Sequence, residues 1–158
     1  MTAAARQSAA CAHCGLAVPA GRTGDALAFC CSGCEIVYTA VAEHGLEQFY
    51  DLRTRSERTP VAAHPTTRGY TELDDPAFHR IHVQVAPDGL ARSALYLEDL
   101  QCTACVWLVE SAPRCLPGVI ELRVDLGRAR ADVTWDPTQT SLSVVARYLD
   151  RIGHVPHP

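Results

Sequence analysis

Two cysteines, Cys102 and Cys105, stand where a strand pattern gives way to a helix pattern. The pattern places them on a loop and in a first helical turn, where free N–H groups and the helix dipole favour thiolate over thiol. Two neighbouring soft thiolates suit Cu(I) or another thiophilic ion, whereas Zn(II) usually takes four ligands. From the spacing alone, three interpretations stay open: a metal site, a redox dithiol, or two inert buried cysteines.

A second group of cysteines lies near the N-terminus. A CxxC, a turn-rich insert and a second cysteine cluster that opens a helix-like stretch have a spacing typical of zinc sites. The predicted ligands are Cys11, Cys14, Cys30 and Cys34, with Cys31 as the alternate to Cys30. Structural Zn(II) is favoured over a second copper site, because so small a segment buries little apolar surface without a metal. His13, inside the first CxxC, is expected to be an exposed polar residue.

The elements around Cys102 and Cys105 follow from hydrophobic periodicity. A strand over 95–97 leads into a helix that Pro113 should kink or end near Ala112. Two antiparallel strands follow, turning at 126–128, with a buried face made of Ile120, Leu122, Val124, Ala129, Ala131, Val133 and Trp135. The apolar stripe of a second helix comprises Leu142, Val145, Leu149 and Ile152. With a short final strand, this order predicts an α+β fold, the ferredoxin-like βαββαβ sandwich.

The chain upstream divides into two parts. Residues 1–52 are predicted to form a small Cys-rich metal-knuckle module, and 53–77, where the periodicity fails, a linker. Residues 78–158 form the sandwich, in which alternation over 78–85 predicts an extra N-terminal edge strand. On that strand His79 and His82 would point to opposite faces, so no shared metal site is expected there.

The C-terminal region resembles the heavy-metal-associated domains of copper-transporting P-type ATPases and copper chaperones. The resemblance spans roughly 93–158 and rests on the CxxC between first strand and first helix and on the element order. It implies that Cys102 and Cys105 hold one Cu(I). Asp99 and Leu100 stand where the family usually has Gly and Met. The stretch 97–110 is similar to the subgroup of these ATPases that serves cytochrome oxidase assembly.

The N-terminal cysteines resemble a treble-clef-like metal-binding module that precedes the CxxC domain in the same subgroup. Both halves then imply a cytosolic region that receives Cu(I) from a copper chaperone by thiolate exchange. The region would deliver copper to, or regulate, the membrane and ATPase domains of a parent pump. The alternatives are a stand-alone soluble copper or zinc carrier and, more remotely, a thiol–disulfide oxidoreductase using Cys102 and Cys105.

Composition excludes several other classes. The net charge is -4, and all 14 basic residues are scattered arginines, so no nucleic-acid partner is expected. Without lysine, the chain can have neither a phosphate-loop lysine nor a Schiff-base lysine. The phosphorylation motif Asp-Lys-Thr-Gly-Thr is missing, so the chain as given is not an enzyme. No apolar run approaches a membrane span, and no export signal is recognisable, so eight reduced cysteines in the cytoplasm are expected.

Overall fold

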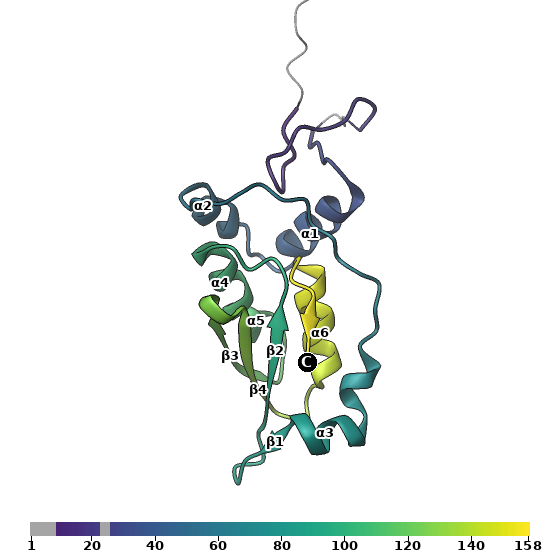
Figure 1. Cartoon of the computed structure of the whole chain (residues 1–158), viewed down its shortest axis with the longest axis vertical. Coiled ribbons are helices and arrows are strands. Elements are labelled where there is room, and N and C mark those ends of the chain that lie inside the picture. Colours follow the sequence, from purple (N-terminus) through teal and green to yellow (C-terminus); the bar gives the residue numbers. More distant parts are fainter. Residues whose placement is uncertain (1–8, 23–25) are drawn as a thin grey trace, which may run out of the picture.

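The computed structural model describes residues 9–22 and 26–158 of the chain. Its C-terminal part is a sandwich of one sheet and covering helices (Figure 1). The elements of this part are β1 (Gln84–Val85), β2 (Ala91–Leu97), α4 (Thr103–Glu110), α5 (Ala112–Cys115), β3 (Val119–Asp125), β4 (Arg130–Trp135), α6 (Leu142–Arg151) and β5 (Pro156–His157).

The sheet has the strand order β1-β2-β4-β3, and β5 also pairs with β2. All pairs are antiparallel. The two short strands bind opposite ends of β2, since Gln84 lies opposite Arg92 and Pro156 lies opposite Leu97. Because β4 occupies the other edge of β2, both short strands share one edge. This is a ferredoxin-like βαββαβ sandwich with an extra edge strand, which confirms the predicted fold class.

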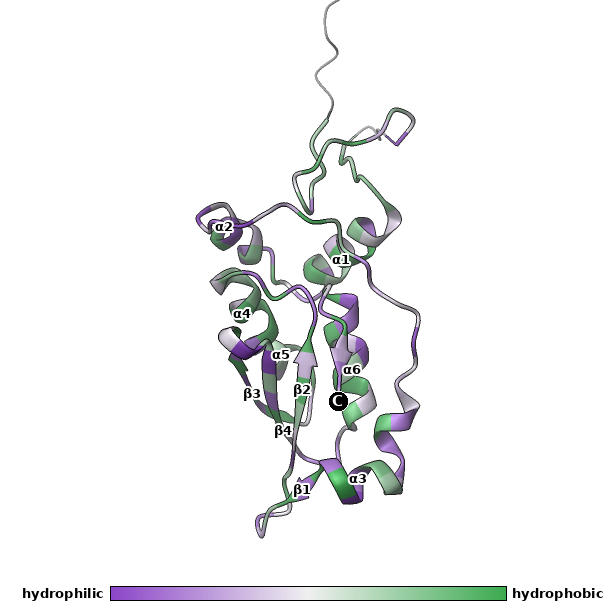
Figure 2. Cartoon of the chain, in the orientation of Figure 1, coloured by the Kyte–Doolittle hydropathy of each residue, from purple (hydrophilic) through white to green (hydrophobic). Residues whose placement is uncertain are grey.

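The core lies between one sheet face and the helices. Leu95 and Leu97 of β2 are buried, as are Val133 and Trp135 of β4. The predicted apolar stripe of α6 is buried throughout, and Gly153 follows with the positive φ of 97° that favours glycine at a helix end. Figure 2 shows α4 mostly in the hydrophobic colours, as expected for a helix packed between the sheet and the N-terminal part.

Two local predictions about the sandwich have different outcomes. The first helix does break before Pro113, because α4 ends at Glu110 and the short α5 follows, which confirms the expected effect of proline. The predicted burial of Ile120 is wrong, since its side chain is 52% exposed and Val119 is buried instead. The register shifts between Val119 and Glu121, and such a bulge turns the side chain between them outward.

The predicted strand over 78–85 is largely wrong. Residues Pro76–His82 form the helix α3, and only β1 is extended. The Asp75 side chain accepts a hydrogen bond of 2.7 Å from the Ala77 N–H, and Pro76 occupies the first turn. An N-cap aspartate followed by proline is a helix start that outweighs a short alternating pattern.

The expected linker, 53–77, packs along α6 (Figure 1). We refer to 61–75 as the strap. Its Tyr70 and Leu73 are buried, and Leu73 belongs to the 3₁₀ helix η1 (Thr71–Asp74). Asp74 accepts a hydrogen bond of 3.0 Å from the N–H of Ser143, at the start of α6. The domain boundaries at 52 and 78 stay predictions, because the strap contacts both parts.

The N-terminal part contains the helices α1 (Ser32–Glu43) and α2 (Gln48–Thr54). Val37 of α1 lies against Gly153, and α2 packs along α4, so one hydrophobic core continues through both parts. None of the helices in the described part of the chain is long and apolar enough to cross a bilayer.

Candidate metal centres

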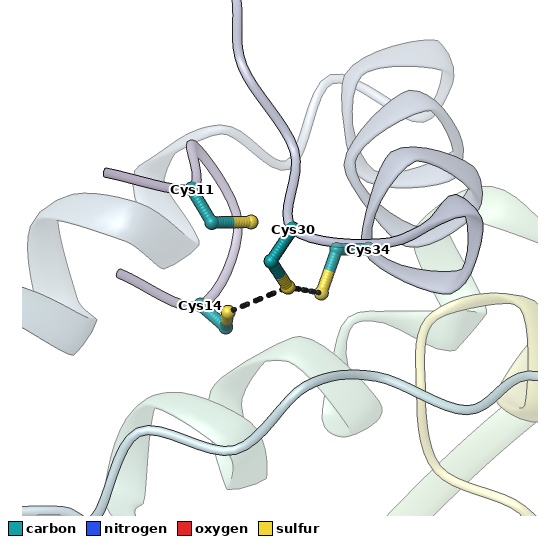
Figure 3. Close-up of side chains that lie close together, drawn as sticks. All are labelled: Cys11, Cys14, Cys30 and Cys34. Carbon is teal, nitrogen blue, oxygen red and sulfur yellow. Dashed lines mark hydrogen bonds between the residues drawn. The ribbon is translucent and has the colours of Figure 1, made fainter. Parts of the chain in front are cut away.

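Four of the N-terminal cysteines converge on one point (Figure 3). The Sγ atoms of Cys11, Cys14, Cys30 and Cys34 all lie within 4.8 Å of one another. Cys30 Sγ is 3.5 Å from Cys14 Sγ and 3.6 Å from Cys34 Sγ. A tetrahedral Zn(II) with Zn–S bonds of about 2.3 Å separates its sulfur atoms by about 3.8 Å. The four thiols therefore have the donor chemistry and the approximate spacing of a tetrathiolate site.

Backbone geometry positions these four thiols. The Cys11 N–H donates to Leu16 O and the Gly15 N–H donates to Cys11 O, closing a tight knuckle. Cys30 precedes α1 and Cys34 lies in its first turn. The Sγ of Cys31 lies outside the group and accepts a hydrogen bond of 3.4 Å from the Cys34 N–H as the N-cap of α1. This placement favours Cys30 over Cys31 as a ligand.

Hydrogen bonding sets the charge of these thiols individually. Burial disfavours the Cys11 thiolate, but N–H groups of Cys14, Cys30 and His13 outweigh it and lower the pKa of Cys11 to about 6. Burial raises the pKa of Cys30 to about 12, helped by the Cys14 thiol. Burial also raises the pKa of Cys34. The hydrogen bond of 3.3 Å that the N–H of Ala63, in the strap, donates to Cys34 Sγ acts in the opposite direction and lowers this pKa. Without metal, Cys30 and Cys34 therefore keep their protons at neutral pH, whereas Cys11 loses its proton.

His13 is buried, so its predicted exposure is wrong. Its Nδ1 lies 3.0 Å from Tyr50 Oη, and its ring stacks on Phe49 at 6.4 Å between centroids. Burial, together with the charges of Arg53 and Arg58, lowers the pKa of His13 to about 3, so the imidazole is neutral. Helix α2 covers the His13 side chain. The contact joins residues that lie 37 positions apart in the sequence, so local spacing does not predict it.

Gly33 lies where the strap crosses the start of α1. A Cβ on Gly33 would lie 2.2 Å from the carbonyl oxygen of Ala63, a backbone atom with little room to move. We expect Gly33→Ala to lower the free energy of unfolding by about 1–3 kcal/mol through this overlap. Urea unfolding measures it, with Gly69→Ala as the matched control, where the nearest atom is 3.8 Å away. Equal stability of the two variants would contradict the close approach.

The second pair of thiols lies at the start of α4. Cys102 is the N-cap residue and Cys105 is in the first turn, as predicted, and their Sγ atoms are 3.5 Å apart. Both cysteines are free, and they are 5% and 7% exposed. Asp99 has a φ of 58°, in the left-handed region that glycine prefers and aspartate tolerates. A glycine, which the family usually has at this position, would adopt this conformation without strain.

The N-terminal part closes over this second pair. A cavity of about 40 Å³ lies between the N-terminal part and this pair of thiols. The cavity is lined by His13, Arg53, Arg58, Asp99, Cys105 and His154. Neither Arg53 nor His154 is among the predicted ligands, and His154 is buried with its Nδ1 3.1 Å from Glu98 O. Cys115, at the end of α5, belongs to neither group of thiols.

Comparison with known families agrees with both halves. The model described as "Putative metal-binding domain of cation transport ATPase" matches residues 10–86, and that of the "Heavy-metal-associated domain" matches residues 94–154. The chain therefore consists of an N-terminal metal-binding domain of cation transport ATPases followed by a heavy-metal-associated domain. Two copper-transporting P-type ATPases also match part of the chain, which confirms the resemblance to these pumps.

Two curated relatives are copper ATPases. The "Probable copper-transporting ATPase PacS" of Synechococcus elongatus is 30% identical over 67 residues, covering 42% of this chain and 9% of the relative. The "Copper-exporting P-type ATPase" of Bacillus subtilis is 25% identical over 61 residues, covering 39% of this chain and 8% of the relative. The matches thus span only a small part of either relative.

Two solved structures are also similar. Oxidised MerP from Ralstonia metallidurans CH34 is 24% identical, with a TM-score of 0.41 over 43% of this chain and 94% of that chain. The N-terminal domain of a potential copper-translocating P-type ATPase from Bacillus subtilis, in its Cu(I)-loaded state, is 22% identical. Its TM-score is 0.39 over 41% of this chain and 81% of that chain.

Proposed function

We propose that this chain is the cytosolic metal-binding region of a copper-transporting P-type ATPase, in the subgroup that serves cytochrome oxidase assembly. Cys102 and Cys105 bind one Cu(I) as cargo, and the region delivers it to the pump or regulates the pump. The observation that carries the proposal is a pair of free thiols, 3.5 Å apart at a helix N-terminus, within a heavy-metal-associated domain. Soft thiolates select Cu(I) over harder cations.

Transfer proceeds by ligand exchange without redox chemistry. A thiolate of Cys102 or Cys105 forms a bond to the two-coordinate Cu(I) that the copper chaperone holds, giving a three-coordinate intermediate. One chaperone thiolate then leaves, and the second exchange places both Cys102 and Cys105 on the ion. The copper stays Cu(I) throughout, and each new Cu–S bond replaces an old one. The helix N-terminus at Cys102 stabilises the negative charge that the two thiolates bring.

The N-terminal site has a different role. Cys11, Cys14, Cys30 and Cys34 hold structural Zn(II), because four soft donors at near-tetrahedral spacing match its preferred coordination and leave no open position. Their knuckle has almost no regular structure of its own, since within the described residues it contains isolated bridge residues, such as the pair Ala10 and Ala17, in place of strands or helices. Metal is thus the element that holds the knuckle together.

An anaerobic Cu(I) titration against a competing chelator tests the proposal. Cys102→Ser/Cys105→Ser is expected to lose one tightly bound copper and to keep its zinc, whereas the control Cys115→Ser keeps both. In the described structure, Cys102 and Cys105 are the only thiols that contact each other at the start of α4. The double variant therefore has no other thiol there to bind copper. Unchanged copper binding by the double variant would refute the assignment and would move copper handling to the N-terminal cysteines.

A further inference from the structure

A buried positive charge lies between the two groups of thiols. Arg53 of α2 is 8% exposed, its Nη1 donates a hydrogen bond to His13 O, and its guanidinium lies 5.3 Å from the centre of the Phe49 ring. A guanidinium does not lose its proton in a protein. A buried charge is costly unless an opposite charge accompanies it, so the anion that accompanies Arg53 has to be identified.

Among the described residues, no carboxylate forms a direct ion pair with Arg53. Within residues 9–22 and 26–158, no aspartate or glutamate oxygen lies within 4.0 Å of the Arg53 guanidinium. Burial lowers the pKa of Arg53, and the side chains that act in the opposite direction are Tyr50, Cys105 and Cys14. Burial raises the pKa of Tyr50, so it remains neutral. Cys105 and Cys14, one from each metal centre, are therefore the side chains whose negative charge would favour the charged form of Arg53.

The geometry directs Arg53 towards Cys105 in particular. Both residues line the cavity beneath the N-terminal part, together with Asp99, which lies on the loop before α4. Helix α2, which carries Arg53, packs along α4, which carries Cys105 (Figure 1). The second cation of the cavity is Arg58, whose Nη2 donates a hydrogen bond to Cys14 O at 3.1 Å. Two cations thus face a cavity that contains one carboxylate and one thiol of the CxxC.

We propose that Arg53 is a positioning residue of the Cys102/Cys105 centre, through which the N-terminal part supplies the counter-charge for the metal-bound thiolates. Two thiolates and one monovalent cation carry a net charge of minus one, and Arg53 neutralises it in a nearly dry environment. This rests on the proposed function and deepens it: the metal site is composite, built by both parts. By linkage, metal binding and docking of α2 on α4 strengthen each other equally.

Three variants of the full zinc-loaded chain test the inference in the same Cu(I) competition assay. Arg53→Gln is expected to weaken Cu(I) binding on the order of tenfold, a typical effect of one nearby charge at intermediate dielectric. Arg53→Lys, which keeps the charge, should stay within about threefold of the wild type. Arg55→Gln, which removes an exposed cation two residues away, should have no effect.

The outcomes separate this inference from the proposed function. If the wild type binds no Cu(I) at Cys102 and Cys105, the proposed function fails and this inference fails with it. If the wild type binds Cu(I) and Arg53→Gln matches Arg55→Gln, only the role of Arg53 is refuted. If Arg53→Lys binds as weakly as Arg53→Gln, the side chain acts through its shape and hydrogen bonding, which also overturns the charge role.

A measurement on the unmutated chain covers the case in which Arg53→Gln loses zinc or unfolds. NMR of the arginine Nε–Hε groups is followed while Cu(I), or Ag(I) as a redox-inert probe, is added. The Arg53 signal is expected to shift and its exchange with water to slow by severalfold on metal binding, whereas the Arg55 signal stays in place. An Arg53 signal that does not respond to one equivalent of bound metal would overturn the proposal.

Discussion

Removal of zinc is expected to unfold the knuckle, 9–31, and to leave the sandwich intact. Binding of structural Zn(II) contributes about 10–16 kcal/mol in small zinc-finger peptides, far more than the few apolar contacts of this segment can replace. The buried apolar side chains before Cys30 are few, and Val18 is the largest of them among the described residues. Hydrogen exchange of the chelated chain measures the effect, as loss of protection in 9–22 and 26–31 with protected amides in β2 and β4.

Matched variants identify the thiols responsible. Cys11→Ser/Cys14→Ser should reproduce the effect of chelation, whereas Cys31→Ser should keep zinc, because the Cys31 sulfur caps α1 and lies outside the group of four. The serine hydroxyl can accept the same hydrogen bond from the Cys34 N–H, so the cap is kept and stability should change little. A Cys31→Ser chain without zinc would show that Cys31, not Cys30, is the ligand. A knuckle that stays protected after chelation would refute the structural role of the metal.

Features that depend on local patterns could be predicted from the sequence. The strand before Cys102, the first-turn position of Cys105 and the stripe of α6 follow from residue types within one or two helical turns, and the structure has all of them. The break before Pro113 belongs to the same class, because a missing N–H acts on its own turn. In such segments local preference and tertiary packing agree.

Features that depend on distant contacts could not be predicted in this way. His13 is buried by a helix that starts 35 residues later, and the alternation that placed Ile120 inward is shifted by a bulge. Arg53 resembles an ordinary surface arginine in the sequence, and only the docking of α2 on α4 buries it. The strap has no hydrophobic periodicity in its sequence. Hydrogen bonds to α6, and not a repeating apolar face, make most of its contacts.

Asp150→Ala is expected to destabilise the chain by about 3–5 kcal/mol. Asp150 is 2% exposed on α6, and it accepts hydrogen bonds from the Thr66 N–H at 2.7 Å, the Thr66 hydroxyl and the Tyr70 hydroxyl at 2.7 Å. The substitution leaves the buried Tyr70 hydroxyl without an acceptor and removes the carboxylate that ties the exposed Thr66 to α6, which costs far more than the loss of a surface bond. Urea unfolding measures the change, as a lower midpoint at unchanged slope.

The effect should spread from the strap to the zinc site and no further. Ala63 of the strap donates its N–H to Cys34 Sγ, so a strap released from α6 should exchange its amides faster and lose zinc to a chelator more readily. Copper stoichiometry at the proposed site, Cys102 and Cys105, should stay at one, because their sulfurs lie 3.5 Å apart at the start of α4 and the strap's hydrogen bonds with sulfur involve Cys31 and Cys34. Asp132→Ala is the control, since its exposed ion pair with Arg130 contributes about 0–1 kcal/mol. If Asp150→Ala is as stable as this control, the strap is held by its apolar side chains alone.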